Sequence, residues 1–338
     1  MSGGRRRLYL GSLVALLLLL LVPFGVQNSY YLQVLFRIFV FAALGLAWNL
    51  VGGYAGQLSL GHVAYFGVGA YAFTLLVRDL HWNPWWSVLG GVGFSVVAAL
   101  LIGSITFRLR GPYFTLATIA TAEILRLLVL NLKDLTGGAV GLPTPALFAG
   151  ASTDRAFYAA AVLLAAVAYA LNLWADRSRF GYYLMAIRED EDTAMAVGVN
   201  PARTKLLALL PSAAITSLAG SLYASSFHYI QADYIFSIDI SNQAAIVAML
   251  GGAGTALGPV LGSVILTTAS ELFKEVFQTA HLLIYGILII LVVLFLPGGV
   301  IGFFGRRSRR RAQREPGPFA GSLSGEEGSP RHSSSSST

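Results

Sequence analysis

Ionisable side chains that interrupt the long apolar stretches are the first candidates for chemistry. They are Arg37, His62, Glu123, Arg126 and Glu271. Glu123 and Arg126 are three residues apart, which places them on one face of a helix where they can pair. A pair inside a membrane helix is either structural or part of a proton relay, and this set is too sparse for a relay. His62 follows Gly61 at the expected start of a helix, so it is either a hydrogen-bonded packing residue or a ligand for a solute.

Two glycine-rich stretches form the candidate translocation path. Residues 49–62 (NLVGGYAGQLSLGH) and 248–262 (AMLGGAGTALGPVLG) each contain an aliphatic residue followed by Gly-Gly, and each interrupts an apolar run. This similarity suggests a weak internal repeat in parallel orientation. Broken helices in matching halves indicate a transport path, whereas glycine-mediated helix packing is the alternative. The candidate path residues are Gly56, Gln57, Ser59, Gly61, His62, Gly251, Gly252 and Gly254.

The longest polar connection, residues 175–205, carries five basic and five acidic side chains. Glu191, Ala194, Met195 and Gly198 lie at helical spacing. Gly198 suits the end of a helix, and Pro201 prevents its continuation. The pattern predicts a short amphipathic helix outside the membrane, either a solvated loop helix or a docking helix for a soluble partner. The candidate docking residues are Arg188, Glu189, Asp190, Glu191, Ala194 and Gly198.

The composition identifies the elements that must position these residues as membrane helices. Of the 338 residues, 56% are hydrophobic and only 12% are charged, against about 25% charged residues in an ordinary soluble domain. A bilayer core requires about 20 apolar residues in a helix. The sequence therefore predicts an all-α, polytopic membrane protein of about ten glycine-broken spans. The runs are Leu8–Val26, Val34–Val51, Gly61–Val77, Trp85–Phe107, Tyr113–Leu130, Phe157–Trp174, Leu206–Tyr223, Asp239–Leu250, Leu257–Leu272 and Leu282–Leu296.

The distribution of basic residues orients the ten expected spans. With both termini in the cytoplasm, 17 of the 23 Lys and Arg residues lie inside and four lie outside, as the positive-inside rule requires. The first run resembles a signal peptide, but it is longer than a typical apolar signal core and no A-x-A site follows it, so we expect a retained helix. We expect a permease domain over residues 1–305 and a disordered, basic, Ser-rich cytoplasmic tail over residues 306–338.

Several classes of function are excluded by what the sequence lacks. There is no cysteine, which excludes disulfides, thiolate metal sites and cysteine nucleophiles. No G-x-x-x-x-G-K-[ST], H-E-x-x-H or G-x-S-x-G motif occurs, so the chain has no P-loop for ATP and no recognisable catalytic centre. The net charge of +7 lies at the chain ends and between apolar runs, which indicates membrane orientation and not nucleic-acid binding. We expect no enzyme activity, metal or cofactor.

An ordered set of motifs resembles the LivM-type permeases of branched-chain amino-acid ABC importers (the LivH/LivM family). The resemblance covers roughly residues 30–300. Its motifs are GGYAGQLSLGHVAYFGVGAY from Gly52, GPYFTLATIATAEILR from Gly111, LTGGAVGLP from Leu135, MAIREDEDTAMAVGVNPARTKLLA from Met185, AGSLYA from Ala219 and MLGGAGTALGPVLG from Met249.

The resemblance implies a cell (inner or plasma) membrane location and a set of partners. These are a LivH-like permease subunit, two cytoplasmic ABC ATPases and an extracytoplasmic solute-binding protein that delivers an amino acid. It also implies that Ile187–Val199 docks on the ATPase. A permease for urea, short-chain amides or other amino acids is the alternative within the family. A stand-alone ion-coupled transporter and a structural membrane protein are the alternatives outside it.

Overall fold

The computed structural model describes residues 18–23, 25–26, 28–148, 150, 153–276, 286 and 299–302. The first expected run, Leu8–Val26, lies mostly outside the described residues, and the last run, Leu282–Leu296, lies almost wholly outside them. The tail at 306–338 is entirely outside. Within the described residues the elements, in chain order, are α2 (Ser29–Trp48), the π-helix η1 (Asn49–Tyr54), α3 (His62–Arg78), α4 (Pro84–Thr106), α5 (Pro112–Asn131), α6 (Lys133–Thr136), β1 (Leu142–Pro143), α7 (Thr153–Arg177), α8 (Arg179–Glu189), α9 (Glu191–Ala196), α10 (Pro201–Phe227), β2 (Tyr229–Ile230), α11 (Ala232–Ile235), α12 (Ile238–Gly251) and α13 (Gly258–Val276).

Six described segments are long and apolar enough to cross a membrane, which confirms the all-α membrane class. They are Ser29–Tyr54, Pro84–Thr106, Pro112–Asn131, Thr153–Arg177, Pro201–Phe227 and Ala232–Gly251. Helices α3 and α13 coincide with two further expected runs, but their apolar lengths are shorter. The count of ten spans and the side on which the termini lie stay predictions.

The helices begin and end where the local sequence requires. The side chains of Asn83 and Asn200 accept hydrogen bonds from the backbone N–H groups of Trp85 and Arg203, in the first turns of α4 and α10, and each asparagine is followed by proline at the first helical position. At the far end of α10, His228 adopts a left-handed conformation with φ of 58°. Between these two ends α10 is continuous, with Pro211 inside it.

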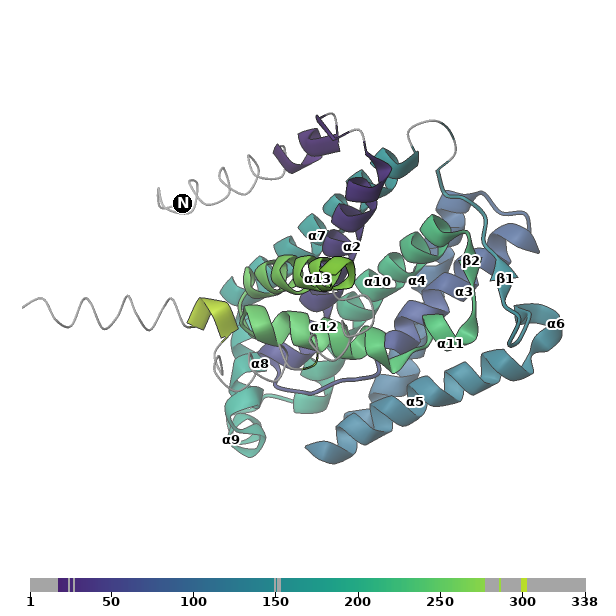
Figure 1. Ribbon diagram of the computed structural model, residues 1–338. Helices are drawn as coiled ribbons and strands as arrows, with labels where there is room; N and C mark the ends of the chain where they lie inside the picture. Colours follow the sequence, from purple (N-terminus) through teal and green to yellow (C-terminus); the bar gives the residue numbers. More distant parts are fainter. Residues whose placement is uncertain are drawn as a thin grey trace, which may run out of the picture.

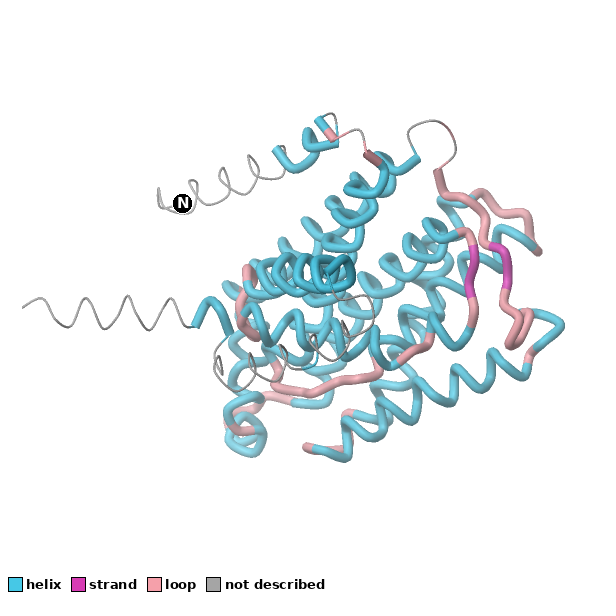
Figure 2. Tube along the Cα trace, viewed as in Figure 1, coloured by secondary structure: helices cyan, strands magenta, loops and turns pink. Residues whose placement is uncertain are grey.

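The core of the bundle is formed by α2, α3, α7 and α10, with α4, α12 and α13 packed around it (Figure 1). Helices α3 and α10 can approach closely because Gly220 has no Cβ; a Cβ there would overlap the carbonyl of Phe66. Helix α5 lies along one edge of the molecule, and only 17% of its apolar window is buried. Figure 2 shows the short loops around α9 on one side of the view and the β1–β2 pair on the other.

The structure corrects several expected boundaries. The first Gly-Gly pair does not end its helix, because the chain continues as the π-helix η1 through Tyr54. The polar connection 175–205 holds two helices, α8 and α9, where one was expected, because Asp190 leaves the helical conformation and caps α9. Strands were not expected, but β1 and β2 form a two-residue antiparallel pair, Leu142 opposite Ile230.

Candidate functional site

A buried asparagine connects three parts of the chain at one end of the bundle. The Asn49 side chain is fully buried. Its Nδ2 donates to Asn172 Oδ1 at 2.9 Å and to the Thr255 carbonyl at 3.0 Å. Its Oδ1 accepts from the backbone N–H of Gly254 at 2.8 Å. Asn172 in turn donates to the Leu46 carbonyl. These bonds join η1 and α7 to the turn between α12 and α13.

This buried network explains the glycine at position 53. A Cβ there would overlap Asn49 Oδ1 and the backbone nitrogen of Gly254. Nearby, the hydroxyl of Tyr54 donates to Asp176 Oδ1 at 2.6 Å near the end of α7. The two glycine-rich stretches, about 200 residues apart in the sequence, are therefore in direct contact.

Arg188, at the end of α8, joins the predicted docking segment to both glycine stretches. Its Nη1 donates to the Gly53 carbonyl at 2.7 Å. A Cβ at Gly56 or at Gly254 would lie 2.8 Å from atoms of Arg188. Both glycines have positive φ, 68° and 81°, so side chains are disfavoured there by conformation as well as by space. The sequence predicted a function for each of these segments but not their contact.

Helix α9 is held against the bundle by charged contacts. The Glu191 carboxylate accepts from Lys205 Nζ at 2.7 Å, and the Lys205 side chain is 0% exposed. Arg110, from the α4–α5 loop, pairs with Asp192 at 2.9 Å and lies 3.9 Å from Glu191. Three segments, α9, α10 and the α4–α5 loop, therefore meet at this point.

The two ends of α9 are fixed by local hydrogen bonds. Asp190 Oδ1 accepts from the backbone N–H of Thr193 at 2.8 Å, and this bond lowers the pKa of Asp190 below its ordinary value. At the other end Gly198 has φ of 90°, and its N–H donates to the Met195 carbonyl. The expected helix end at Gly198 is confirmed.

The predicted docking residues divide into anchors and exposed groups. Ala194 is buried and Glu191 points to Lys205, whereas Glu189, Asp190 and Gly198 are exposed. The outer surface also contains side chains that were not among the candidates: Asp192, Met195 and Val197, with Asp192 and Val197 each 74% exposed. Spacing alone did not show which face of α9 would be buried.

Among the path candidates, His62 and its neighbours are packing residues in this conformation. His62 is buried, with Nδ1 3.1 Å from Ser59 Oγ and Nε2 2.9 Å from Ser212 Oγ. Gly61 lies against Thr118 of α5. The other candidates nearest the surface are Gly56, which is exposed, and Gln57, which is half-buried.

The second glycine turn is tightly closed. A Cβ at Gly251 would overlap the carbonyl of Gly258, so α12 and α13 meet almost backbone to backbone. Gly252 follows with φ of 129°, and Gly254 completes the turn against Asn49. At the end of the bundle where Arg188 lies, the structure thus brings together all the path glycines except Gly61.

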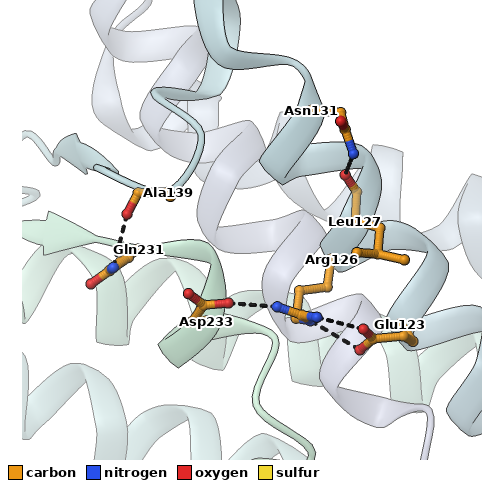
Figure 3. A network of polar contacts seen from close by, with 7 residues as sticks. All are labelled: Glu123, Arg126, Leu127, Asn131, Ala139, Gln231 and Asp233. Carbon is orange, nitrogen blue, oxygen red and sulfur yellow. Dashed lines mark hydrogen bonds and ion pairs between the residues drawn. The ribbon is translucent and has the colours of Figure 1, made fainter.

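The expected Glu123–Arg126 pair is confirmed and has a third member. Arg126 Nε and Nη2 donate to the two Glu123 oxygens at 2.9 and 2.5 Å, and Nη1 donates to Asp233 Oδ1 at 2.6 Å (Figure 3). Asp233 lies on α11, more than 100 residues further along the chain. The sequence contained no local signal for this contact. Within the described residues no group of three or more His, Cys, Asp or Glu side chains could hold a metal ion.

Comparison with known proteins identifies a family for this chain. Residues 30–293 match the family model described as "Branched-chain amino acid transport system / permease component". The chain is 31% identical over 318 residues to the high-affinity branched-chain amino acid transport system permease protein LivM of Escherichia coli K12, covering 86% of this chain and 74% of the relative. The LivM protein of Salmonella typhimurium is 30% identical, covering 78% and 68%.

A second kind of permease protein is also similar. The LivH protein of Escherichia coli K12 is 26% identical over 300 residues, covering 82% of this chain and 97% of the relative. No solved structure matches the chain. The described residues include six helices long and apolar enough to span a membrane, so the protein is a multi-pass membrane permease, and the chain belongs to the family of branched-chain amino acid transport permease components.

Proposed function

We propose that this chain is one of two membrane subunits of an ABC importer for branched-chain amino acids. The second subunit is a LivH-like permease, two cytoplasmic ATPases supply the energy, and an extracytoplasmic solute-binding protein delivers the substrate. Support comes from the family match and from similarity to both LivM and LivH proteins. Both are described as permease proteins of a high-affinity branched-chain amino acid transport system.

The proposal includes ten membrane spans with both termini in the cytoplasm. Residues 1–305 form the permease domain and residues 306–338 form a cytoplasmic tail. The end of the bundle around α8 and α9 carries Arg110, Arg177, Arg179, Arg188 and Arg203, which is the charge expected of the cytoplasmic face. The α5 helix then runs outward from Pro112 to Asn131.

The ATPase docks on the outer surface of α9 in this proposal. Arg188, Glu189, Asp190, Glu191, Ala194 and Gly198 build the docking segment, in which Glu191 and Ala194 are anchors. Asp192, Met195 and Val197 supply exposed surface. The observation that carries the proposal is that this exposed segment is tied by Arg188 to the Gly53 carbonyl and by Glu191 to the buried Lys205.

These ties give a direct route for transmission of movement. Closure of the ATPase dimer displaces α9, and the ion pairs carry that displacement to α10 and the α4–α5 loop. Arg188 carries it to the two glycine turns, at Gly53, Gly56 and Gly254. Gly56, Gln57, Ser59, Gly61, His62, Gly251, Gly252 and Gly254 border or support the inner gate of the path. ATP drives the transport cycle because it binds more tightly to one of the two conformations of the transporter, outward-facing or inward-facing.

Reconstitution tests the proposal. Liposomes that contain both permease subunits and the ATPases should take up L-leucine, L-isoleucine and L-valine only when ATP and the solute-binding protein are supplied. Omission of the ATPase should abolish uptake. Uptake by this chain alone, driven by an ion gradient, would instead identify a secondary transporter. Uptake of urea or short amides without leucine would place the substrate elsewhere in the family.

A further inference from the structure

A charged cavity lies on the side of α5 that faces α11, apart from the glycine-rich candidate path. Its volume is about 310 Å³, at the small end of the range for ligand pockets. The wall combines Glu123, Arg126 and Asp233 with apolar side chains that include Val63, Ile119 and Phe236. Figure 3 shows Arg126 between the two carboxylates, which come from separate helices.

The charges lie well inside the membrane-spanning length of α5. At 1.5 Å per residue, Glu123 is about 16 Å along the axis from Pro112 and about 12 Å from Asn131. Arg126 is one turn nearer to Asn131. An ionisable group at this depth is costly in lipid, and such groups face a water-filled cavity or another protein.

The cluster differs from an ordinary structural ion pair in its charge and exposure. Two carboxylates share one guanidinium, which leaves a formal charge of −1. The side chains of Glu123 and Asp233 are 49% and 52% exposed in this chain. By comparison, the side chains of the Arg37–Glu271 ion pair between α2 and α13 are only 31% and 15% exposed. We therefore expect this half-exposed charged cluster to face the aqueous path, with the partner permease covering the open side of the cavity.

We propose that this cavity is a transient binding site for the zwitterionic head of an α-amino acid, which refines the substrate path of the proposed function. Arg126 uses three of its five N–H groups in the bonds to Glu123 and Asp233. The other two N–H groups remain for hydrogen bonds to the α-carboxylate of the substrate. The α-ammonium pairs with the carboxylates of Glu123 and Asp233 beside Arg126, and the zwitterion as a whole leaves the formal charge of the site at −1. The aliphatic side chain packs against Val63, Ile119 and Phe236, which gives weak selectivity for size.

The lack of cysteine in the chain allows a direct binding test in the assembled transporter. The variant Ile119→Cys places a thiol in the cavity wall, and Ile124→Cys places one on the exposed side of α5. With the partner permease and ATPases made cysteine-free, maleimide labelling is measured without the solute-binding protein. We expect millimolar L-leucine to slow labelling at position 119 and not at position 124.

The two halves of the zwitterion separate this proposal from simpler sites. 4-Methylpentanoate lacks the ammonium and 3-methylbutylamine lacks the carboxylate, so both should protect Ile119→Cys at least tenfold less well than L-leucine. Equal protection by 3-methylbutylamine would identify a cation site, and no protection by L-leucine would exclude this cavity as a binding site. Either result overturns the proposal.

Transport by the full complex provides the second measurement. Asp233→Asn and Arg126→Gln each remove a charged hydrogen-bond partner of the substrate. We expect each variant to lower leucine uptake by about tenfold or more. Arg37→Gln is the matched control for loss of an intramembrane arginine. Equal loss in all three variants, with reduced recovery of the complex, would indicate a purely structural cluster and overturn the proposal. If the wild-type complex takes up no branched-chain amino acid while L-leucine still protects Ile119→Cys, the proposed function fails and the site stands.

Discussion

Substitution of Glu191 by Gln should detach α9 from the bundle, although it changes a carboxylate to an amide of the same size. Lys205 is 0% exposed, and Glu191 Oε2 lies 2.7 Å from its ammonium. Loss of one partner of a buried ion pair costs about 3–5 kcal/mol, because the other charge stays buried without compensation. At 1.4 kcal/mol per factor of ten, the smaller figure already raises the detached population of α9 by about 100-fold.

Hydrogen exchange measured by mass spectrometry is the appropriate assay. The amides of Ala194, Val197, Gly198 and Val199 donate within this segment, so their protection should fall by about 100-fold or more in Glu191→Gln. The ATPase should also co-purify poorly with this variant, while membrane insertion is unchanged. The same result is expected for Glu191→Lys, which adds a second cation beside Lys205.

Two further variants test whether the Glu191–Lys205 ion pair holds α9. Asp192→Asn removes an exposed pair with Arg110, worth about 1 kcal/mol or less, so protection should fall by no more than about fivefold. Combining Glu191→Gln with Lys205→Met removes both buried charges and should restore most of the protection. If Glu191→Gln behaves like Asp192→Asn, the buried ion pair does not hold α9 and the anchoring argument is wrong.

Three further perturbations test other parts of the same end of the bundle. Gly251→Ala forces a Cβ onto the Gly258 carbonyl and should destabilise the protein by about 1–3 kcal/mol in thermal unfolding in detergent. The control Gly93→Ala, inside α4, places a Cβ that meets nothing within 4 Å and should cause no destabilisation. Asn49→Ala leaves buried polar groups unpaired and should cost about 1–3 kcal/mol in the same assay. Because the pKa of Asp190 is lowered, its cap contributes full stability to α9 at pH values above the ordinary pKa of 3.8, and this stability is lost as the pH falls through the lowered pKa. Hydrogen-exchange rates of α9, corrected for their intrinsic pH dependence, should therefore rise only in that acidic range. The variant Asp190→Asn should not show this rise.

Local patterns in the sequence predicted the helices but not the contacts between distant segments. The apolar runs correspond to the membrane helices because lipid requires continuous apolar lengths. Gly198 and Pro201 mark the end of α9 and the start of α10 through backbone conformation alone. These are properties of neighbouring residues, so no knowledge of the tertiary structure was needed.

The contacts that give the candidate site its geometry span large sequence separations. Arg188 and Gly53 are 135 residues apart, and Arg126 and Asp233 are 107 apart. Lys205 ends the polar connection 175–205, and only the structure shows that its side chain is fully buried, 2.7 Å from Glu191 Oε2. The continuation of the helix through Gly52 and Gly53 as η1 was not predicted from the sequence. In the structure Trp48 and Asn49, one turn earlier, leave no room for a Cβ at these glycines.

In the proposed mechanism a cytoplasmic ATPase moves this permease through the exposed surface of α9. Val197, which is 74% exposed, reports on that surface when replaced by cysteine in this cysteine-free chain. A membrane-impermeant maleimide should label Val197→Cys in inverted membrane vesicles and not in intact spheroplasts, and a bound ATPase should protect it. Labelling from the outside of spheroplasts, or labelling in inverted vesicles that the ATPase does not change, would contradict the account.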